Sequence, residues 1–474
     1  MVSTFTSAIV VALSVIALAV LLSALRKSIK SSAWNSAALL GALSVVLFSS
    51  VYLVLTYSSS WDLVTEQNQD LRLKPQWGNY LIMLVGGTLA AACAVICFRA
   101  VRRNKFSNTY NPAAVLALAL LVVSVTATFL NGDNPIRPAT ALMLAVLAAC
   151  TVAPRGLGVH VGIGTICVIA AVTSGFAIAV HKDFSVMPCP WDKCGVLGFQ
   201  FRGIFQHPNT FAIFLTLAMP FVYIGFASWE GPLLSTYLLG LVLLSGSRSA
   251  AVAAVLTFVL LIVVRPSVRR PVWAPKRTTL LYLVLGLAFV VGVATPLVVN
   301  DPDFLTGRGH IWMLARGEVL HPATFFQGIG MLAWKHVVDA GMVHISASYS
   351  VHNQWLQVLY SAGLIGFILF VGVLALLIWQ AGRTYCLVIG CVLLPVFLLG
   401  VSERPWPIDS ADWVIWVVPG ALLSYPVARR SSDDRTMENP DVSKEPVATS
   451  AAQDEEQAGA TSRCQQSGGH TAER

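Results

Sequence analysis

The chain contains 474 residues, of which 56 % are hydrophobic and only 11 % are Asp, Glu, Lys or Arg, and its formal net charge is +8. Soluble proteins carry roughly 25 % charged residues, so this composition excludes a soluble enzyme, a disordered protein and a disulfide-stabilised scaffold. The apolar residues occur in blocks of about twenty, the length that an α-helix needs to cross a ~30 Å hydrocarbon core. These blocks are apolar on every face, unlike the alternating strands of a transmembrane barrel. The sequence therefore predicts an all-α fold, a polytopic transmembrane helical bundle.

Twelve or thirteen spans are expected in residues 1–428, which we interpret as one membrane domain. The first apolar segment is too long for the core of a signal peptide, and basic residues follow it rather than precede it, so we interpret it as a retained span. Two segments, 138–153 and 233–245, are short for a span. In chain order the expected spans are 6–25, 34–57, 78–98, 112–130, 138–153, 158–180, 209–228, 233–245, 249–264, 279–299, 355–380, 385–401 and 412–428.

The distribution of basic residues predicts the orientation of these spans. Lys and Arg are retained on the cytoplasmic side of a membrane. Arg26, Lys27 and Lys30 follow the first span, so the N-terminus is placed outside. Alternation then puts sixteen basic residues and one acidic residue, Glu230, on the inner side. Topology thus accounts for most of the basic residues, and we expect no nucleic-acid partner.

Three segments differ in composition from the spans. Two are outward loops, 181–208 and 300–354, and the second is the longest loop and holds five of the nine histidines. The third is 429–474, which has almost no large apolar residues and is predicted to be a disordered cytoplasmic tail. Polar groups at a membrane border usually mark a substrate path or an anchor, so the two loops are where we expect the function.

The loop 181–208 contains two cysteines five residues apart, Cys189 and Cys194. An oxidising exterior would allow a local disulfide between them. Spacing alone leaves the paired and the reduced states equally open, because disulfide geometry is not visible in a sequence. The other cysteines mostly lie inside spans, where Cys behaves as a small apolar residue.

In the longer loop, Arg308 follows a candidate helix start. Thr306 is expected to cap a helix that runs to about Leu320. Arg308 would then lie in the first turn, where free backbone N–H groups favour an anion and a guanidinium adds a fork that matches phosphate. The alternative is an interfacial amphipathic helix on which Arg308 and Arg316 extend toward the membrane surface.

His352 is placed at the outer mouth of the span 355–380. A neutral imidazole there could take a proton from a sugar hydroxyl as a general base. The alternative is a histidine that starts a helix and bonds a neighbouring carbonyl. The other four histidines of this loop are too irregularly spaced to suggest a metal cluster.

Two more arginines, Arg202 and Arg248, fall on the same predicted side. Arg202 precedes a helix that Pro208 can open, and Arg248 lies in a tight turn between two spans. Each by itself is compatible with an arginine extending to the membrane surface. Together with Arg308 and His352, they suit a lipid diphosphate with a base nearby.

The segment Asp301-Pro302-Asp303 matches the Asp-x-Asp pattern with which some glycosyltransferases hold a divalent ion. The same three residues after a span are also typical of a turn or a helix start. Because arginines could neutralise a diphosphate, we expect neither a metal nor another cofactor.

Four motifs occur in one order on the predicted outward face, within about residues 200–380. They are Arg202-Gly203 with His207-Pro208-Asn209, Ser247-Arg248-Ser249, Gly307-Arg308 with Ile311-Trp312 and Gly328-Ile329-Gly330, and His352-Asn353 with Ala362-Gly363-Leu364-Ile365-Gly366. In this order the set resembles the O-antigen ligase and Wzy-type polymerase family of bacterial membrane glycosyltransferases. The N-terminal part agrees only in being a series of spans.

The resemblance implies a GT-C-like bundle with a partly helical extracytoplasmic loop in the bacterial cytoplasmic membrane. It implies transfer of a glycan from a polyprenyl diphosphate, such as undecaprenyl diphosphate, to an acceptor hydroxyl of a glycan, lipid or protein, with inversion and without metal. Arg308 and His352 match the catalytic loop, and Arg202 and Arg248 match other basic positions that hold the diphosphate. An odd number of spans with the N-terminus outside departs from the family, as does the tail.

Two other functions remain open from the sequence. A secondary transporter of an anion is the main alternative from another class, although transporters commonly place ionisable residues near the bilayer midplane, where the expected spans have almost none. A protein O-oligosaccharyltransferase would use the same His and Arg chemistry on a different acceptor, and a cell-wall polymerase is a more remote possibility.

Overall fold

The computed structural model describes residues 4–30, 36–57, 76–102, 110–189, 194–226, 228–269, 273–343 and 350–426. All of them belong to one compact unit, Met1–Ala428. The expected tail, 429–474, lies outside the described residues.

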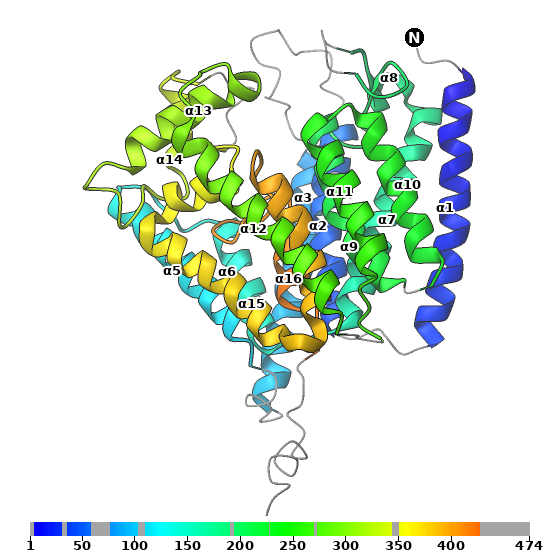
Figure 1. Ribbon diagram of the computed structural model, residues 1–474, viewed down its shortest axis with the longest axis horizontal. Helices are drawn as coiled ribbons and strands as arrows, with labels where there is room; N and C mark the ends of the chain where they lie inside the picture. The colour runs from blue at the N-terminus through cyan, green and yellow to red at the C-terminus, as the bar shows by residue number, and fades with distance from the viewer. Residues whose placement is uncertain are drawn as a thin grey trace, which may run out of the picture. The chain divides into compact units, whose positions relative to one another are not determined.

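The described chain is an all-α bundle, as the composition predicts (Figure 1). Eight of its helices are long and apolar enough to cross a membrane, namely α1 (Thr4–Lys30), α2 (Ser36–Tyr57), α3 (Gln76–Arg102), α5 (Pro112–Leu130), α7 (Leu157–Val180), α9 (Pro208–Gly225), α12 (Pro275–Val298) and α15 (Gln354–Gly400). Three shorter apolar helices are α6 (Pro138–Val152), α10 (Glu230–Ser245) and α11 (Arg248–Val264). The loops add α8 (Lys182–Ser185), α13 (Phe304–Val319), α14 (Ala333–Asp339) and an antiparallel pair, β1 (Val186–Met187) with β2 (Gln200–Phe201).

The expected last span, 412–428, is wrong as a helix of span length. Within the part that the structure describes, only α16 (Val417–Leu422) is helical there, and the chain from 401 to 416 is irregular. Pro405 and Pro407 remove backbone donors that a helix would need. The segment is nevertheless buried inside the bundle, since Trp406 and Trp416 are both fully inaccessible. The apolar composition of this segment therefore reflects its burial inside the bundle, and it does not indicate a membrane-crossing helix.

Helix α15 contains two breaks, at Gly363 (φ 62°, ψ −165°) and Gly382 (φ 54°, ψ −165°). Gly382 falls between the expected spans 355–380 and 385–401, so these are separate helical segments. They fold back on each other, because the side-chain amide of Gln354 at the start of α15 donates to the Trp406 carbonyl, which follows its end, at 3.0 Å. The two ends of α15 thus meet.

At the break at Gly363, the longer loop, 300–354, is bound to the bundle. There the backbone of α15 pairs with the segment 325–330: the Ile329 N–H donates to the Tyr360 carbonyl at 2.8 Å, and the Leu364 N–H donates to the Phe325 carbonyl at 2.8 Å. A buried backbone group must find a partner inside the protein. The loop supplies the partners that the interrupted helix lacks, which fixes the loop to α15.

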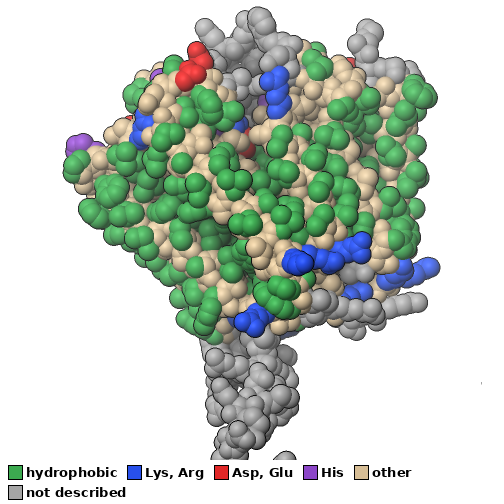
Figure 2. All heavy atoms as spheres, viewed as in Figure 1, with side chains coloured by type: hydrophobic (Ala, Val, Ile, Leu, Met, Phe, Trp, Pro, Cys, Tyr) green, Lys and Arg blue, Asp and Glu red, His purple; other side chains and the backbone are tan. Residues whose placement is uncertain are grey.

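The two ends of the bundle differ in charge. At one end Lys27 pairs with the buried Glu230 at 2.5 Å, and Arg155 donates to the Gln380 side chain at 2.7 Å. Lys and Arg gather along this lower part in Figure 2, below a broad band of hydrophobic side chains. Both outward loops, with α8, α13 and α14, lie at the opposite end (Figure 1). This arrangement agrees with the predicted alternation of the spans.

Gly363 and Gly382 provide a matched test of the docking. Both adopt a conformation that is essentially restricted to glycine, so alanine at either position should cost about 1–3 kcal/mol of unfolding free energy. At Gly363 a Cβ would also lie 2.4 Å from the Phe326 carbonyl carbon, whereas nothing lies within 4 Å at Gly382. We expect Gly363→Ala to lower the unfolding temperature in detergent more than Gly382→Ala and to speed amide exchange in 325–330. Equal effects of the two variants on both measurements would contradict the docking.

Candidate functional site

The start of α13 differs from the expected one. The helix begins at Phe304, two residues before Thr306, and so Thr306 is not its N-cap. Leu305 (φ 48°) and Gly307 (φ 88°) are left-handed, which makes the segment before Arg308 irregular. The Gly307 N–H, one of the groups expected to bind an anion, donates instead to the Asp303 carbonyl at 3.3 Å. Arg308 is the fifth residue of α13 and follows a kinked segment, so it does not lie in the first helical turn.

His352 is held in a left-handed backbone conformation (φ 51°), which is uncommon for a residue other than glycine. Its N–H donates to the Ser350 hydroxyl at 3.2 Å. The next residue, Asn353, caps α15 by accepting from the Leu356 N–H at 2.8 Å. The Asn353 amide also donates to the carbonyls of Gly292 on α12 and Val401 beyond α15. These bonds hold the backbone around His352 from several sides. A strained left-handed conformation persists only where the surrounding structure holds it in this way.

Glu403 connects Arg308 and His352, the two residues that the resemblance would place in a catalytic loop. One carboxylate oxygen accepts from Arg308 Nη2, and the other lies 3.2 Å from His352 Nδ1. Glu403 is buried, while Arg308 and His352 keep 17 % and 23 % of their side-chain surface exposed. Arg308 and His352 are thus brought together on one carboxylate, and both remain reachable from outside.

The pKa of Glu403 follows from these contacts. Burial alone would raise the pKa of this carboxyl, but the Arg308 charge and the His352 hydrogen bond hold it below its ordinary value. Glu403 is accordingly a carboxylate at neutral pH. A carboxylate on Nδ1 favours the tautomer that donates from that nitrogen, which leaves Nε2 of His352 as a base.

Sequence reasoning missed Glu403. The available signal was a pair of charges, Glu403-Arg404, directly after an apolar segment. Arg404 donates to the Asp412 carboxylate at 2.9 Å and lies 3.9 Å from Asp409. Burial would lower the pKa of Arg404, but these two carboxylates raise it, so the guanidinium stays charged. The pairing anchors the segment that carries Glu403.

Arg202 has a different environment from Arg308. It is 6 % exposed, and its guanidinium donates to the carbonyls of Phe184 at 2.5 Å and Gln206 at 3.0 Å. The cation also lies 4.5 Å from the centre of the Phe184 ring. These contacts hold the loop 181–208 together. A role for Arg202 in binding a diphosphate remains a prediction.

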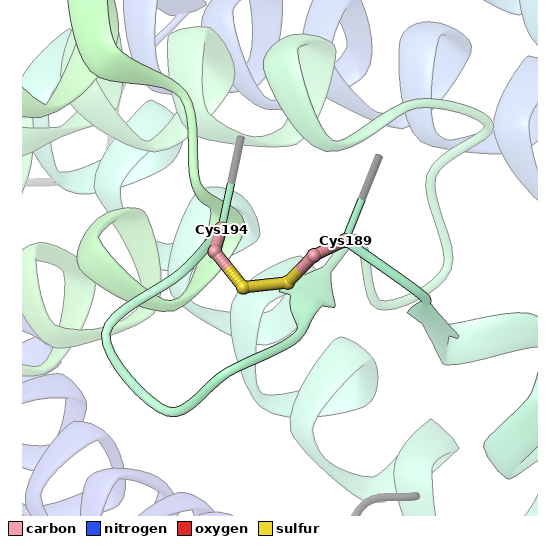
Figure 3. Close-up of a disulfide and its surroundings, with 2 residues drawn as sticks. All are labelled: Cys189 and Cys194. Atoms are coloured by element: carbon pink, nitrogen blue, oxygen red, sulfur yellow. A yellow bond between two sulfur atoms is a disulfide. The ribbon is translucent and has the colours of Figure 1, made fainter. Parts of the chain in front are cut away.

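Arg248 is exposed at the first position of α11. The turn before it is covered by the other outward loop, because the Val196 N–H donates to the Leu243 carbonyl at 3.3 Å. A disulfide joins Cys189 to Cys194 in that loop, with a Cα–Cα distance of 5.0 Å (Figure 3). The structure thus places the cross-linked loop beside Arg248, whose predicted role with the diphosphate remains a prediction.

The segment Asp301–Asp303 forms a turn. The Asp301 carboxylate accepts from the Asp303 N–H at 3.1 Å, and the Asp301 carbonyl accepts from the Phe304 N–H at 3.3 Å. Over the described ranges, no group of three His, Cys, Asp or Glu side chains is arranged to hold a metal ion.

The fold and these contacts define a multi-pass helical membrane protein with a compact Arg–Glu–His group at the end that carries its two large loops. No protein-family model matches the chain, and no curated protein shows significant similarity to it.

Replacing Glu403 by glutamine tests the shared carboxylate. Because it leaves the largely buried Arg308 without its counter-charge, Glu403→Gln should lower the unfolding free energy by about 3 kcal/mol at neutral pH. The pKa of Glu403 is depressed in the folded state, so the stabilisation is present above the ordinary glutamate pKa of about 4.3 and is lost as the pH falls through the lower folded value. Unfolding temperatures measured against pH should therefore converge for the two proteins in acid. A constant difference down to the most acidic pH would contradict the assignment.

Proposed function

We propose that the protein is a glycosyltransferase that moves a glycan from a polyprenyl diphosphate to an acceptor hydroxyl at the outer face of the bacterial cytoplasmic membrane. The observation that carries the proposal is the contact of Arg308 and His352 with the single carboxylate of Glu403. A cation for the leaving group and a base for the attacking group are thereby adjacent.

The chemistry of these side chains suits that reaction. The acceptor O–H would attack the anomeric carbon, and the bond from that carbon to the diphosphate oxygen would break. The proton would pass to Nε2 of His352, and the diphosphate would leave with the bonding electrons. A guanidinium has five N–H donors, and the contact with Glu403 is made through Nη2, so Arg308 has further donors for phosphate oxygens. A fixed cation beside the leaving diphosphate stabilises the charge that develops in the transition state.

The position of the group also supports this function. It lies at the end of the bundle opposite the Lys27–Glu230 pair, and the basic residues of that other end fit the cytoplasmic side. A lipid-linked donor and an external acceptor could both reach it. No metal or cofactor is needed in this scheme, because the arginine neutralises charge without one.

Three acceptors are compatible with the same chemistry: a growing glycan, a lipid-linked core and a protein hydroxyl. Deleting the gene separates them. Short unpolymerised units would indicate a polymerase, lost attachment of chains of normal length would indicate a ligase, and loss of protein glycosylation would indicate a protein O-oligosaccharyltransferase.

A transporter is the second candidate, and one observation favours it. Glu403 and Asp409 are buried in an irregular segment that follows a helix end, and buried ionisable groups beside broken helices are common in transporters. Uptake or efflux that depends on Glu403, with unchanged surface glycan in its variants, would favour this function.

His352 and His310 provide a matched comparison for the enzyme. Removing a general base usually costs 10²–10⁴-fold in rate, so His352→Ala should abolish detectable surface glycan, as should Arg308→Ala. His310 belongs to the same loop, but its imidazole contacts the Met342 carbonyl at 3.2 Å and not Glu403, so His310→Ala should leave the product near the wild-type amount. Glycan is measured on gels of cells with equal amounts of inserted protein. Wild-type glycan in both His352→Ala and Arg308→Ala would refute the proposed function.

A further inference from the structure

A recess lies in the outward loop, apart from the Arg308–Glu403–His352 group, none of whose residues lines it. It is a pocket of about 560 Å³ between α13, α14 and the start of α15. Glu318 on α13 stands ten residues after Arg308, which corresponds to about 15 Å along a helix. Packed side chains connect the pocket with the group, because Trp312 and the pocket residue Tyr360 share one buried cluster and the Trp312 indole donates to the Val351 carbonyl at 3.0 Å.

The pocket has an apolar floor and a polar rim. The floor consists of the buried side chains of Ala333 and Val337, and Ile329 lies beside them in the lining. The rim carries Glu318, one of whose carboxylate oxygens accepts from the Tyr360 hydroxyl at 2.5 Å. This contact orients the carboxylate at the wall of the pocket.

Two histidines complete the rim with both donors and acceptors. The Nδ1 atom of His321 accepts from the Ala323 N–H at 3.3 Å, so its other ring nitrogen carries the proton and can donate. His336 lies 3.0 Å from the Asp133 carboxylate through Nε2, which leaves Nδ1 as an acceptor when the ring is neutral. A hydroxyl group both donates and accepts, and so it matches such a rim.

The charge of the pocket disfavours an anionic occupant. None of the residues that line it, all within the described part of the chain, is Lys or Arg, and Glu318 contributes a negative charge. A phosphate or diphosphate would be repelled. An uncharged ring with apolar faces and peripheral hydroxyls fits both the floor and the rim.

We infer that this pocket is a distal saccharide site, which binds a sugar residue of the glycan remote from the bond that reacts. The inference rests on the proposed function. The occupied residue belongs either to the donor glycan or to the acceptor glycan, since both present the same chemistry. A sugar bound in the pocket would fix the position of the glycan relative to Arg308 and His352. Contacts far from the reacting bond would thus help to position that bond.

Two variants test the pocket without touching the reacting group. Gly317 lines the pocket, and a Cβ there would meet nothing within 4 Å, so Gly317→Phe should fill it without a backbone clash. Glu318→Gln removes the charge and keeps an oxygen for the Tyr360 hydroxyl. The control is Lys335→Phe, which adds the same bulk at an exposed position of α14 outside the pocket lining.

The probe is the oligosaccharide that mild acid releases from the polyprenyl lipids of the source cells, titrated into the purified full-length protein. We expect Gly317→Phe and Glu318→Gln to raise its dissociation constant by about tenfold or more, the loss of roughly one charge-assisted hydrogen bond. Lys335→Phe should bind as the wild type does, and all three variants should keep the wild-type unfolding temperature within a few degrees. In transfer assays, a raised KM for the donor assigns the pocket to the donor glycan, and a raised KM for the acceptor assigns it to the acceptor.

Failure of the pocket is distinguishable from failure of the proposed function. Wild-type affinity and wild-type KM values in stably folded Gly317→Phe, together with loss of transfer in His352→Ala, would overturn the saccharide site alone. Full transfer in His352→Ala and Arg308→Ala would overturn the function, and the inference with it.

Discussion

Every backbone N–H and C=O group inside an apolar bundle must find its partner within the protein, and this constraint organises the whole structure. Long helices satisfy it for most of the chain. Where α15 breaks at Gly363, the segment 325–330 supplies the missing partners. Beyond the end of α15, the Gln354 side chain both accepts from the Trp406 N–H and donates to its carbonyl. Near the Arg308–Glu403–His352 group, loops and side chains thus supply partners for irregular backbone.

The same pairings make that group rigid. Asn353 caps α15 and bonds to α12 and to Val401, so the residue before it, His352, has little freedom. Glu403 follows the other end of α15 and is anchored by its neighbour Arg404. A site built at element ends that are held on several sides can keep a reactive geometry without help from a ligand. The strain at His352 is consistent with such a role.

Buried charges in this region come in compensated sets. Glu403 pairs with Arg308 and His352, and Arg404 pairs with Asp409 and Asp412. Desolvation makes an isolated charge very costly, whereas mutual pairing offsets much of that cost. Arg202 shows the contrasting use of the same residue type: its donors bind loop carbonyls, and it stabilises a fold segment. The residue type and the predicted side of the membrane do not distinguish an arginine that pairs with a carboxylate from one that binds loop carbonyls.

The sequence by itself determined the all-α membrane fold, most of the helical segments, the end that carries the loops, and the placement of Arg308 and His352 in one loop. These features depend on composition and on patterns within about twenty residues, which are local properties of the chain. Only the tertiary structure decided that Glu403 joins the two, that 401–416 is an irregular segment packed inside the bundle, and that the pocket beside Glu318 exists. Arg308 and His352 lie 95 and 51 positions before Glu403. Such contacts arise when distant segments pack together, and no local pattern encodes that packing.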